Sequence, residues 1–452
     1  MRRLILSTAF AVTAIAAFAA QPKNVILFIG DGMSTPQRMT AEEFSRKSGR
    51  GPLALNNLPF QATTRTCSAN SLVTDSAAAA TAIACGEKTR NGSLGVDANG
   101  KKVYSSAAFA KQQGKKVGVI TSVTINHATP GGFYAHRKSR GDGYGIGLDL
   151  LSSGFDLFAG DELTKHNDCK HAEYRGDIYA LAETEAGYKF INDDTVAFLN
   201  LKPGCGKVWF VSSSYPFAID VSEKTKSPSL AQMTAKGIEL LDNPDRGFFM
   251  MVEGGKIDWA GHANDAATNL REMLALDDAV KVALDFQKRN PDTLIVVTGD
   301  HETGGMSMGF AGTGYNFYME KLVGQKRSMA RTEAVIKERK IVEFAELRRY
   351  VEENFVFDFT DDDWKQMEKA FAKDVENTKK GIRENEKYDA VKVSQFPNVL
   401  KQIVSHKCGI GWSSGAHTAL PVLTTAAGPG ADVFHGFIDN TDISKKLISL
   451  MK

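Results

Sequence analysis

Acidic and imidazole side chains gather in one short stretch of this sequence, directly after an apolar run. Asp258 and His262 are four residues apart, so one helical turn would place both on the same face. Carboxylate and imidazole groups are ligands that suit zinc. Glu253 closes the preceding apolar run and offers the hard oxygen ligand that magnesium prefers. Because packing alone does not explain a charge at the end of a buried strand, the stretch predicts a metal site.

Similar residues follow or precede other apolar runs. Asp31 lies between two glycines, Asp300 and His301 are adjacent, and His417 stands just before a late apolar run. A single aspartate between glycines is more often only a turn. Carboxylate and imidazole groups at several strand ends are instead typical of a hydrolase that uses more than one metal ion.

Ser76 begins an alanine-rich run with high helix propensity. Asp75 or Ser76 would lie at the start of this helix, and a capping role is the simpler interpretation. The alternative is that Ser76 is a nucleophile. A phosphate carried on it would meet free backbone N–H groups and the positive end of the helix dipole.

Thr129 and Arg140 complete the set of candidate residues. A threonine hydroxyl can join an oxygen-rich metal site, and a guanidinium can hold two phosphate oxygens. Taken alone, each residue is also compatible with a position in a solvent-exposed loop that has no binding role. The glycine-rich segment 141–147 follows no clear strand, so it is interpreted as a surface loop and not as a phosphate loop.

The elements that would position these residues are short apolar strands and intervening helices. Continuous runs of Val, Ile, Leu and Phe predict buried strands of a sheet covered on both faces by helices. Residues 266–289 predict a helix between two of these strands. The fold class is therefore α/β with a mostly parallel central sheet, and ligands would bind at the carboxyl ends of its strands. The predicted strands are 24–30, 117–123, 208–212, 248–252, 294–298 and 421–425.

A segment dense in charged residues interrupts this pattern at about 318–402. Thr360 and Asp363 resemble a capping box that opens a helix, with Trp364, Met367 and Phe371 on one face. The segment is interpreted as a helical insertion in the sheet domain, because the chemical motifs resume after it. A separate helical domain is the alternative.

Composition bounds the class of protein. The chain has 452 residues, 42% hydrophobic and 24% charged, which excludes a disordered chain, a collagen and a polytopic membrane protein. The net charge of +2 gives no electrostatic footprint for nucleic acid. Residues 1–19 have a basic start, an apolar run and a small-residue cleavage site, so they predict a signal peptide; an uncleaved anchor is the alternative. Removing them leaves 53 basic and 53 acidic residues, because they hold two of the 55 Lys and Arg.

Export would place the five cysteines where disulfides persist. Cys169 and Cys205 bracket a polar stretch and are the preferred pair among Cys67, Cys85, Cys169, Cys205 and Cys408. At least one thiol must then be free or pair between chains.

Together these motifs closely resemble the alkaline phosphatase family. Seven recur in order: Asp-Gly-Met, Thr-Asp-Ser-Ala, His-Ala-Thr-Pro, Arg140, Glu-Gly-Gly-x-Ile-Asp-x-x-x-His, Thr-x-Asp-His-Glu-Thr-Gly-Gly and His-Thr. The resemblance implies a three-layer sandwich over residues 20–452, with less typical stretches at about 155–205 and 318–402. It also implies an exported, periplasmic or secreted homodimer that hydrolyses phosphate monoesters and has neither a nucleic-acid-binding domain nor a membrane span.

The resemblance further implies two zinc ions, one magnesium ion and a covalent phosphoserine at Ser76. Arg140 would bind the phosphate and Asp75 would help to orient it. The first zinc would be held by Asp258, His262 and His417, the second by Asp31, Asp300 and His301, and the magnesium by Asp31, Thr129 and Glu253.

Two positions vary within the family. His127 replaces an aspartate of some bacterial members, and Trp259 stands where others have Lys or His. Neither would bind metal directly, but the His127 imidazole could favour zinc over magnesium in the third site. The competing hypotheses are a sulfatase, a phosphodiesterase, and an exported phosphate- or metal-binding protein without turnover. No cysteine lies in a Cys-x-Pro-x-Arg segment of the kind a sulfatase needs.

Overall fold

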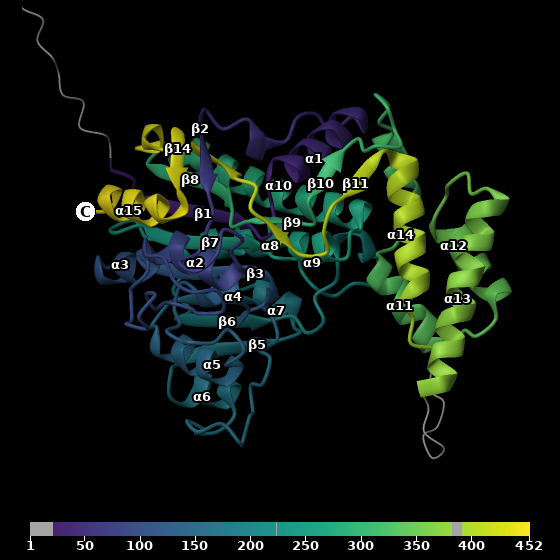
Figure 1. Cartoon of the computed structure of the whole chain (residues 1–452). Helices are drawn as coiled ribbons and strands as arrows, with labels where there is room; N and C mark the ends of the chain where they lie inside the picture. Colours follow the sequence, from purple (N-terminus) through teal and green to yellow (C-terminus); the bar gives the residue numbers. More distant parts are fainter. Residues whose placement is uncertain (1–20, 223, 382–390) are drawn as a thin grey trace, which may run out of the picture.

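A ten-stranded sheet forms the centre of the molecule (Figure 1). The computed structural model describes residues 21–222, 224–381 and 391–452. All neighbouring strands are parallel except β13, which is antiparallel to both β8 and β2. The strand order is β14 (Gly436–Asp439), β2 (Phe60–Arg65), β13 (Val422–Ala427), β8 (Thr293–Gly299), β1 (Asn24–Gly30), β7 (Phe248–Gly254), β3 (Lys116–Thr124), β4 (Leu157–Asp161), β6 (Lys207–Val211) and β5 (Tyr188–Asn192).

The central strands are apolar at every position because both faces of the sheet are covered. In β1, Ile26 and Phe28 belong to one hydrophobic cluster, whereas Val25 and Leu27 belong to another on the opposite face. This confirms the predicted α/β class with a mostly parallel sheet and helices on both faces. The six predicted strands all form, and residues 266–289 form α10 (Ala266–Arg289).

Two groups of helices supply the layers. One group packs with the cluster that contains Phe28, and the other packs with the cluster that contains Leu27. The first group consists of α1 (Thr35–Lys47), α7 (Thr195–Leu199), α8 (Leu230–Leu241) and α10. The second consists of α2 (Ser76–Cys85), α3 (Ser106–Gln112), α4 (Ala128–Gly131), α5 (Gly143–Ser152), α6 (Ile178–Thr184) and α15 (Asn440–Leu450).

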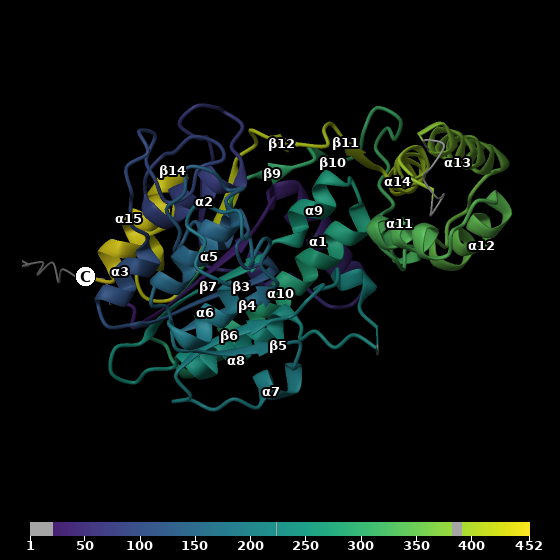
Figure 2. The same cartoon turned by 90° about the horizontal axis from the view of Figure 1, so that it is seen from below.

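The charged segment forms a helical crown beside the sheet, at the right of both views (Figure 1, Figure 2). It has its own hydrophobic cluster. Thr360 and Asp363 make the predicted capping box, and Trp364, Met367 and Phe371 are buried together. The crown consists of α11 (Met329–Glu338), α12 (Phe344–Asn354), α13 (Asp361–Gly381) and α14 (Gln395–Cys408), with a short 3-10 helix (Met319–Gly324) at its base.

Two short ladders connect the crown and the sheet edge. β9 (Glu302–Thr303) pairs with β12 (His417–Thr418), and β10 (Met306–Met308) pairs with β11 (Ile410–Trp412). Helix α9 (Lys256–His262) follows β7 directly.

Two predictions about loops are wrong. Cys169 and Cys205 are both free, as are the other three cysteines of the described chain. Cys205 packs against the cluster of α8 and α10, while Cys169 is exposed in the loop before α6, whose residues pack on the opposite face. Residues 143–147 lie in α5 and not in a surface loop, since Asp142 caps that helix by accepting from the N–H of Gly145 at 3.0 Å.

The predicted signal peptide lies outside the described residues. No helix within the described ranges has the length and hydropathy needed to cross a membrane.

Asp374 is the polar centre of the crown and provides a stability test. This side chain of α13 is fully buried and accepts from the N–H groups of Gln395 and Phe396 at the start of α14. We expect Asp374→Ala to lower the free energy of unfolding by about 1–3 kcal/mol, because it leaves buried donors unpaired. Urea denaturation measures the change. Glu368→Ala, an exposed position of the same helix, is the control; an equal effect of both variants would contradict this assignment.

Candidate active site

The register of the sheet brings the predicted metal-binding residues to one edge. Gly30 of β1 is level with Gly254 of β7 and with Gly299 of β8. The residues that follow these strands therefore face one crevice, as expected for the carboxyl ends of parallel strands. Asp31 turns into the crevice through Gly32, which has a φ of +73°; a Cβ there would lie 2.9 Å from the Cα of Asp258.

The first cluster consists of Asp258, His262 and His417. The Nε2 atoms of His262 and His417 are 3.2 Å apart, and each lies 3.4 Å from a carboxylate oxygen of Asp258. Two ligands at 2.0–2.1 Å from a tetrahedral zinc are about 3.3 Å apart, so this spacing fits one ion.

Hydrogen bonds orient both imidazoles of this cluster. Nδ1 of His262 lies 2.8 Å from the carbonyl of Gly415, and Nδ1 of His417 lies 2.9 Å from the carbonyl of Thr74. A carbonyl can only accept, which assigns the proton to Nδ1 and leaves the Nε2 lone pairs directed at the shared centre.

The second cluster surrounds His301. Its Nε2 atom lies 3.3 Å from Asp31 Oδ1, 3.2 Å from Asp300 Oδ2 and 3.2 Å from the hydroxyl of Ser76. Asp31, Asp300 and His301 are fully buried, and Ser76 is 1% exposed. Asp258 also lies within reach of this group, so the first two clusters adjoin.

The third cluster adds Glu253 and His127 to Asp31. The hydroxyl of Thr129 donates to Asp31 Oδ2 at 3.2 Å, and the hydroxyl of Thr121 donates to Glu253. His127 Nδ1 lies 3.9 Å from Asp31 Oδ2, so the imidazole faces this cluster directly.

Burial and mutual repulsion raise the pKa values of the shared carboxyl groups. Burial, then the charges of neighbouring carboxylates, raises the pKa of Asp31 well above its ordinary value. The same causes raise the pKa of Asp300 to about 7, and burial raises that of Glu253 to about 8. Without cations, the crevice cannot hold all of these groups as carboxylates at neutral pH.

Asp258 behaves differently from the other carboxyl groups. Burial opposes its charged form, but the close approach of the imidazoles of His417, His301 and His262 brings its pKa below the ordinary value. Burial lowers the pKa of His301, and burial with the charge of Arg140 lowers that of His127 to about 4, so both imidazoles are neutral at pH 7.

Four buried polar atoms of these clusters have no hydrogen-bond partner among the described residues. They are Asp31 Oδ1, Glu253 Oε1, Asp300 Oδ2 and His127 Nδ1. Buried polar atoms are normally paired, and oxygen and imidazole nitrogen atoms converging from several elements are what zinc and magnesium bind. The residues present therefore fit three adjacent metal ions.

Ser76 is the first residue of α2, and Asp75 caps that helix by accepting from the N–H of Ala78 at 2.9 Å. The other oxygen of Asp75 lies 3.2 Å from Arg140 Nη1, while Arg140 Nη2 lies 3.2 Å from His127 Nε2. The guanidinium is thus fixed beside the nucleophile candidate and remains one-third exposed.

The structure brings all of the predicted site residues into one crevice, with Trp259 against His127 at a ring-centroid distance of 6.2 Å. It adds three that the sequence analysis did not single out. Thr303 donates to Asp258 at 2.6 Å, and Glu302 accepts from the N–H of Gly305 and from Thr418. Both lie within a quoted motif, whereas Thr121 lies inside a strand and had no signal.

A fourth group of possible ligands lies apart from the crevice, at Asp142, His171 and Glu173. Arg137 already pairs with both carboxylates. His171 Nδ1 accepts from the N–H of Glu173, so Nε2 carries the proton and donates to Asp142. We interpret this group as a structural ion-pair network.

The chain is similar to known proteins of one family. The family profile described as "Alkaline phosphatase" matches residues 22–146 and 184–452. The chain is 32% identical to alkaline phosphatase 4 of Bacillus subtilis (strain 168) over 453 residues, covering 96% of this chain and 89% of that protein.

Solved structures show the same similarity. The cold-active alkaline phosphatase of the psychrophile Shewanella sp. superposes with a TM-score of 0.80 at 29% identity, covering 95% of this chain and 100% of that one. A variant of TAB5 alkaline phosphatase in which a histidine is replaced by aspartate, with Mg bound in the M3 site, has a TM-score of 0.65 at 26% identity, covering 96% and 99%.

The raised pKa values predict how the metal-free protein responds to pH. From about pH 6.5 to about pH 8, folded Asp300 and Glu253 still hold, wholly or in part, protons that the unfolded chain, with ordinary carboxyl pKa values, has lost. The unfolded state then binds fewer protons, so the free energy of unfolding should fall as the pH rises. The lowered pKa values of His127 and His301 act in the opposite direction, but only below about pH 6.5, where unfolded histidine titrates.

Urea denaturation in the presence of a chelator at several pH values measures this slope. Added zinc and magnesium should flatten it, because cations keep the carboxyl groups ionised. Glu253→Gln should remove its own part of the slope. A free energy of unfolding that rises across this window would contradict the electrostatics described above.

Proposed function

The chain belongs to the alkaline phosphatase family, whose members hydrolyse phosphate monoesters, and we propose that it does so through a covalent phosphoserine at Ser76. One observation carries this proposal. The Ser76 hydroxyl begins α2 and lies 3.2 Å from His301 Nε2, at the junction of the buried clusters. A serine that only capped a helix would have no reason to face these ligands.

We assign the metal ligands by cluster. Asp258, His262 and His417 would hold one zinc ion; Asp31, Asp300 and His301 would hold a second; and Asp31, Thr129 and Glu253 would hold magnesium. The spacing of the first cluster and the unpartnered buried atoms of the other two support this assignment. Bound cations supply Lewis-acid charge that favours the ionised nucleophile and offsets negative charge on the phosphoryl group.

The chain's own residues would bind and orient the substrate. Arg140 would hold two phosphoryl oxygens, and Asp75 would keep the guanidinium in place while it caps α2. Ser76 would lose its proton to solvent and attack phosphorus while the P–O bond to the alcohol breaks, so the alcohol would leave and take up a proton from solvent. The new phosphate ester would meet the N–H groups of the first turn of α2. Water would then displace Ser76 from the opposite side, so two in-line steps retain the configuration at phosphorus.

The third site is where this chain departs from some members. His127 faces Asp31 and Glu253, and its buried Nδ1 has no hydrogen-bond partner in the described ranges. An imidazole here favours zinc more than a carboxylate would. We propose that magnesium still binds, since Thr129, Asp31 and Glu253 supply oxygen atoms.

We propose further that residues 1–19 are a signal peptide and that residues 20–452 are one alkaline phosphatase domain of an exported, periplasmic or secreted enzyme. The stretches at about 155–205 and 318–402 would be insertions. The first insertion is supported by the family profile, which leaves out residues 147–183. The second is supported by the separate hydrophobic cluster of the crown, although the profile does include residues 318–402. A homodimer is proposed from the family resemblance alone.

Replacing the nucleophile tests the proposed mechanism. We expect Ser76→Ala to lower kcat/KM for 4-nitrophenyl phosphate on the order of 10³-fold or more, and to abolish the phosphoserine trapped by acid quench. Ser106→Ala is a matched control, because Ser106 is the buried first residue of α3. Unchanged hydrolysis by Ser76→Ala would leave only a phosphate- or metal-binding role for the crevice.

The third site has its own test. After chelation, zinc alone should restore only part of the activity, and full activity should return when magnesium is added. His127→Asp should retain more magnesium after dialysis, measured by metal analysis, because a carboxylate is a harder ligand than imidazole. Full activity of the unchanged protein in zinc alone would rule out a magnesium requirement.

A further inference from the structure

Lys256 is a buried cation that the proposed mechanism does not use. It is only 4% exposed, although it lies just two residues before Asp258. Its Nζ atom donates to the carbonyl of Tyr215 and lies 5.0 Å from the ring centroids of both Phe217 and Trp259. Burying an ammonium group costs free energy unless its surroundings compensate the charge, so this arrangement requires a reason.

The neighbouring carboxylates supply part of the compensation and hold one segment in place. Asp161 accepts from the N–H of Tyr215 at 3.2 Å, and Glu272 accepts from the N–H of Ala218 at 2.6 Å. Both carboxyl groups act electrostatically on Lys256. Three buried charged side chains thus fix residues 215–218, which follow β6.

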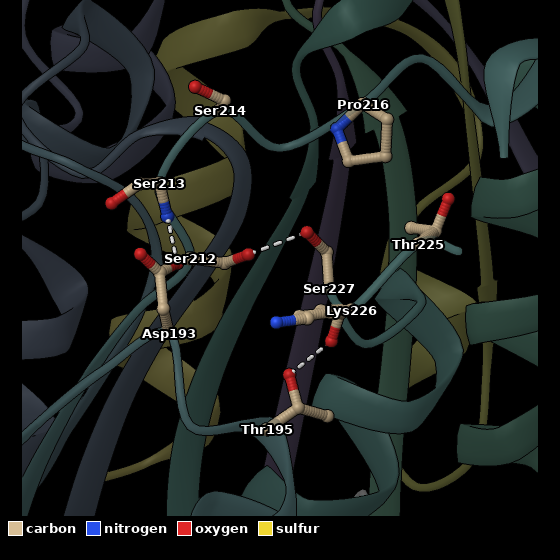
Figure 3. Close-up of a pocket in the computed structure, with 9 residues that line it drawn as sticks. All are labelled: Asp193, Thr195, Ser212, Ser213, Ser214, Pro216, Thr225, Lys226 and Ser227. Carbon is tan, nitrogen blue, oxygen red and sulfur yellow. Dashed lines mark hydrogen bonds between the residues drawn. The ribbon is translucent and has the colours of Figure 1, made fainter.

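Further hydrogen bonds hold the two residues Ser212 and Ser213, which lie shortly before this segment (Figure 3). Asp193 accepts from the N–H of Ser213 at 2.7 Å, and the hydroxyl of Ser212 donates to Ser227 at 2.7 Å. These residues and Pro216 line a hollow of about 420 Å³. The segment is therefore held by buried carboxylates along its length and by hydrogen bonds shortly before it, which limits the movement of its aromatic residues.

These aromatic residues reach the phosphate-binding candidates. Phe217 meets Trp259 edge-on at 6.5 Å between ring centroids, and Trp259 meets His127 edge-on at 6.2 Å. His127 in turn lies 3.2 Å from Arg140, atom to atom. We define Phe217 and Trp259 as the aromatic wall; His127 links it to the guanidinium, and both rings are half-buried.

We infer that the aromatic wall contacts the organic group of the phosphate monoester and that Lys256 is the positioning residue that holds the wall in place. A substrate whose phosphoryl group lies on Arg140 would extend its alcohol portion past Trp259. Flat apolar groups would gain contact there, because aromatic pairs are stabilised by edge and offset contacts. The wall would therefore favour aryl over small alkyl phosphate monoesters. This inference rests on the proposed function.

Binding of phosphonates, which the enzyme cannot hydrolyse as esters, tests the wall apart from the chemistry. Titration calorimetry of the metal-loaded protein would compare phenylphosphonate with methylphosphonate. We expect Phe217→Ala to raise the ratio of the two Kd values, phenyl over methyl, by about 3- to 10-fold. Phe437→Ala, at an exposed position of the edge strand β14, is the matched control and should leave the ratio unchanged.

A double-mutant cycle tests the role of Lys256. Lys256→Met keeps the length of the side chain and removes its charge, so the wall should loosen and the ratio should rise as in Phe217→Ala. When Phe217→Ala is already present, Lys256→Met should change the Kd ratio little further, because one of the two rings of the wall has been removed. If Phe217→Ala weakens the binding of both phosphonates equally, or leaves the Kd ratio unchanged, the wall does not contact the organic group. If the effects of Lys256→Met and Phe217→Ala on the Kd ratio are additive, Lys256 does not position the wall.

The two proposals fail in different ways. If the unchanged protein does not hydrolyse 4-nitrophenyl phosphate, the proposed function is wrong. If it does hydrolyse this ester while the phosphonate ratio is insensitive to Phe217→Ala, the function stands and the wall is wrong.

Discussion

Repulsion among buried carboxylates is the constraint on which the rest of this structure depends. Asp31, Glu253, Asp258 and Asp300 converge at one sheet edge with almost no access to water. Such a group of charges is unstable in a folded protein unless cations are present or protons are taken up. The pKa values of Asp31, Glu253 and Asp300 are raised for this reason. The fold must hold ligands in place that, without a cation, would separate.

The parallel sheet meets this requirement with strong backbone constraints. β1 is hydrogen-bonded on both sides, to β7 and to β8, over nearly its whole length. Each of the three strands ends in a glycine at the same level, so the chain can turn sharply and place the next side chain in the crevice. Hydrophobic clusters on both faces then prevent the strands from sliding to relieve the repulsion.

Much of this arrangement was predictable because it is local in the sequence. Uninterrupted apolar runs predict buried strands, and a carboxylate directly after such a run predicts a ligand at the sheet edge. The supporting residues were harder to find. Thr303 and Glu302 act through contacts with Asp258 and Thr418, which lie 45 and 116 residues away, and Thr121 belongs to a strand whose pattern explains it as packing. The cysteine prediction was wrong because sequence spacing does not reveal which face of the sheet each residue reaches.

The position of the crown in the chain explains the two short ladders. His301 and His417 both line the crevice, but all four helices of the crown lie between them in the sequence. Their rings nevertheless stack at 3.6 Å between centroids, so two separated segments must meet accurately. The pairing of β9 with β12 places His417 opposite Thr303, and Glu302 accepts from Thr418 across the same ladder. Because this junction fixes the histidine, the crown beyond it can differ in size and sequence without moving a ligand, provided that the ladders remain. A large helical insertion is therefore compatible with an intact crevice.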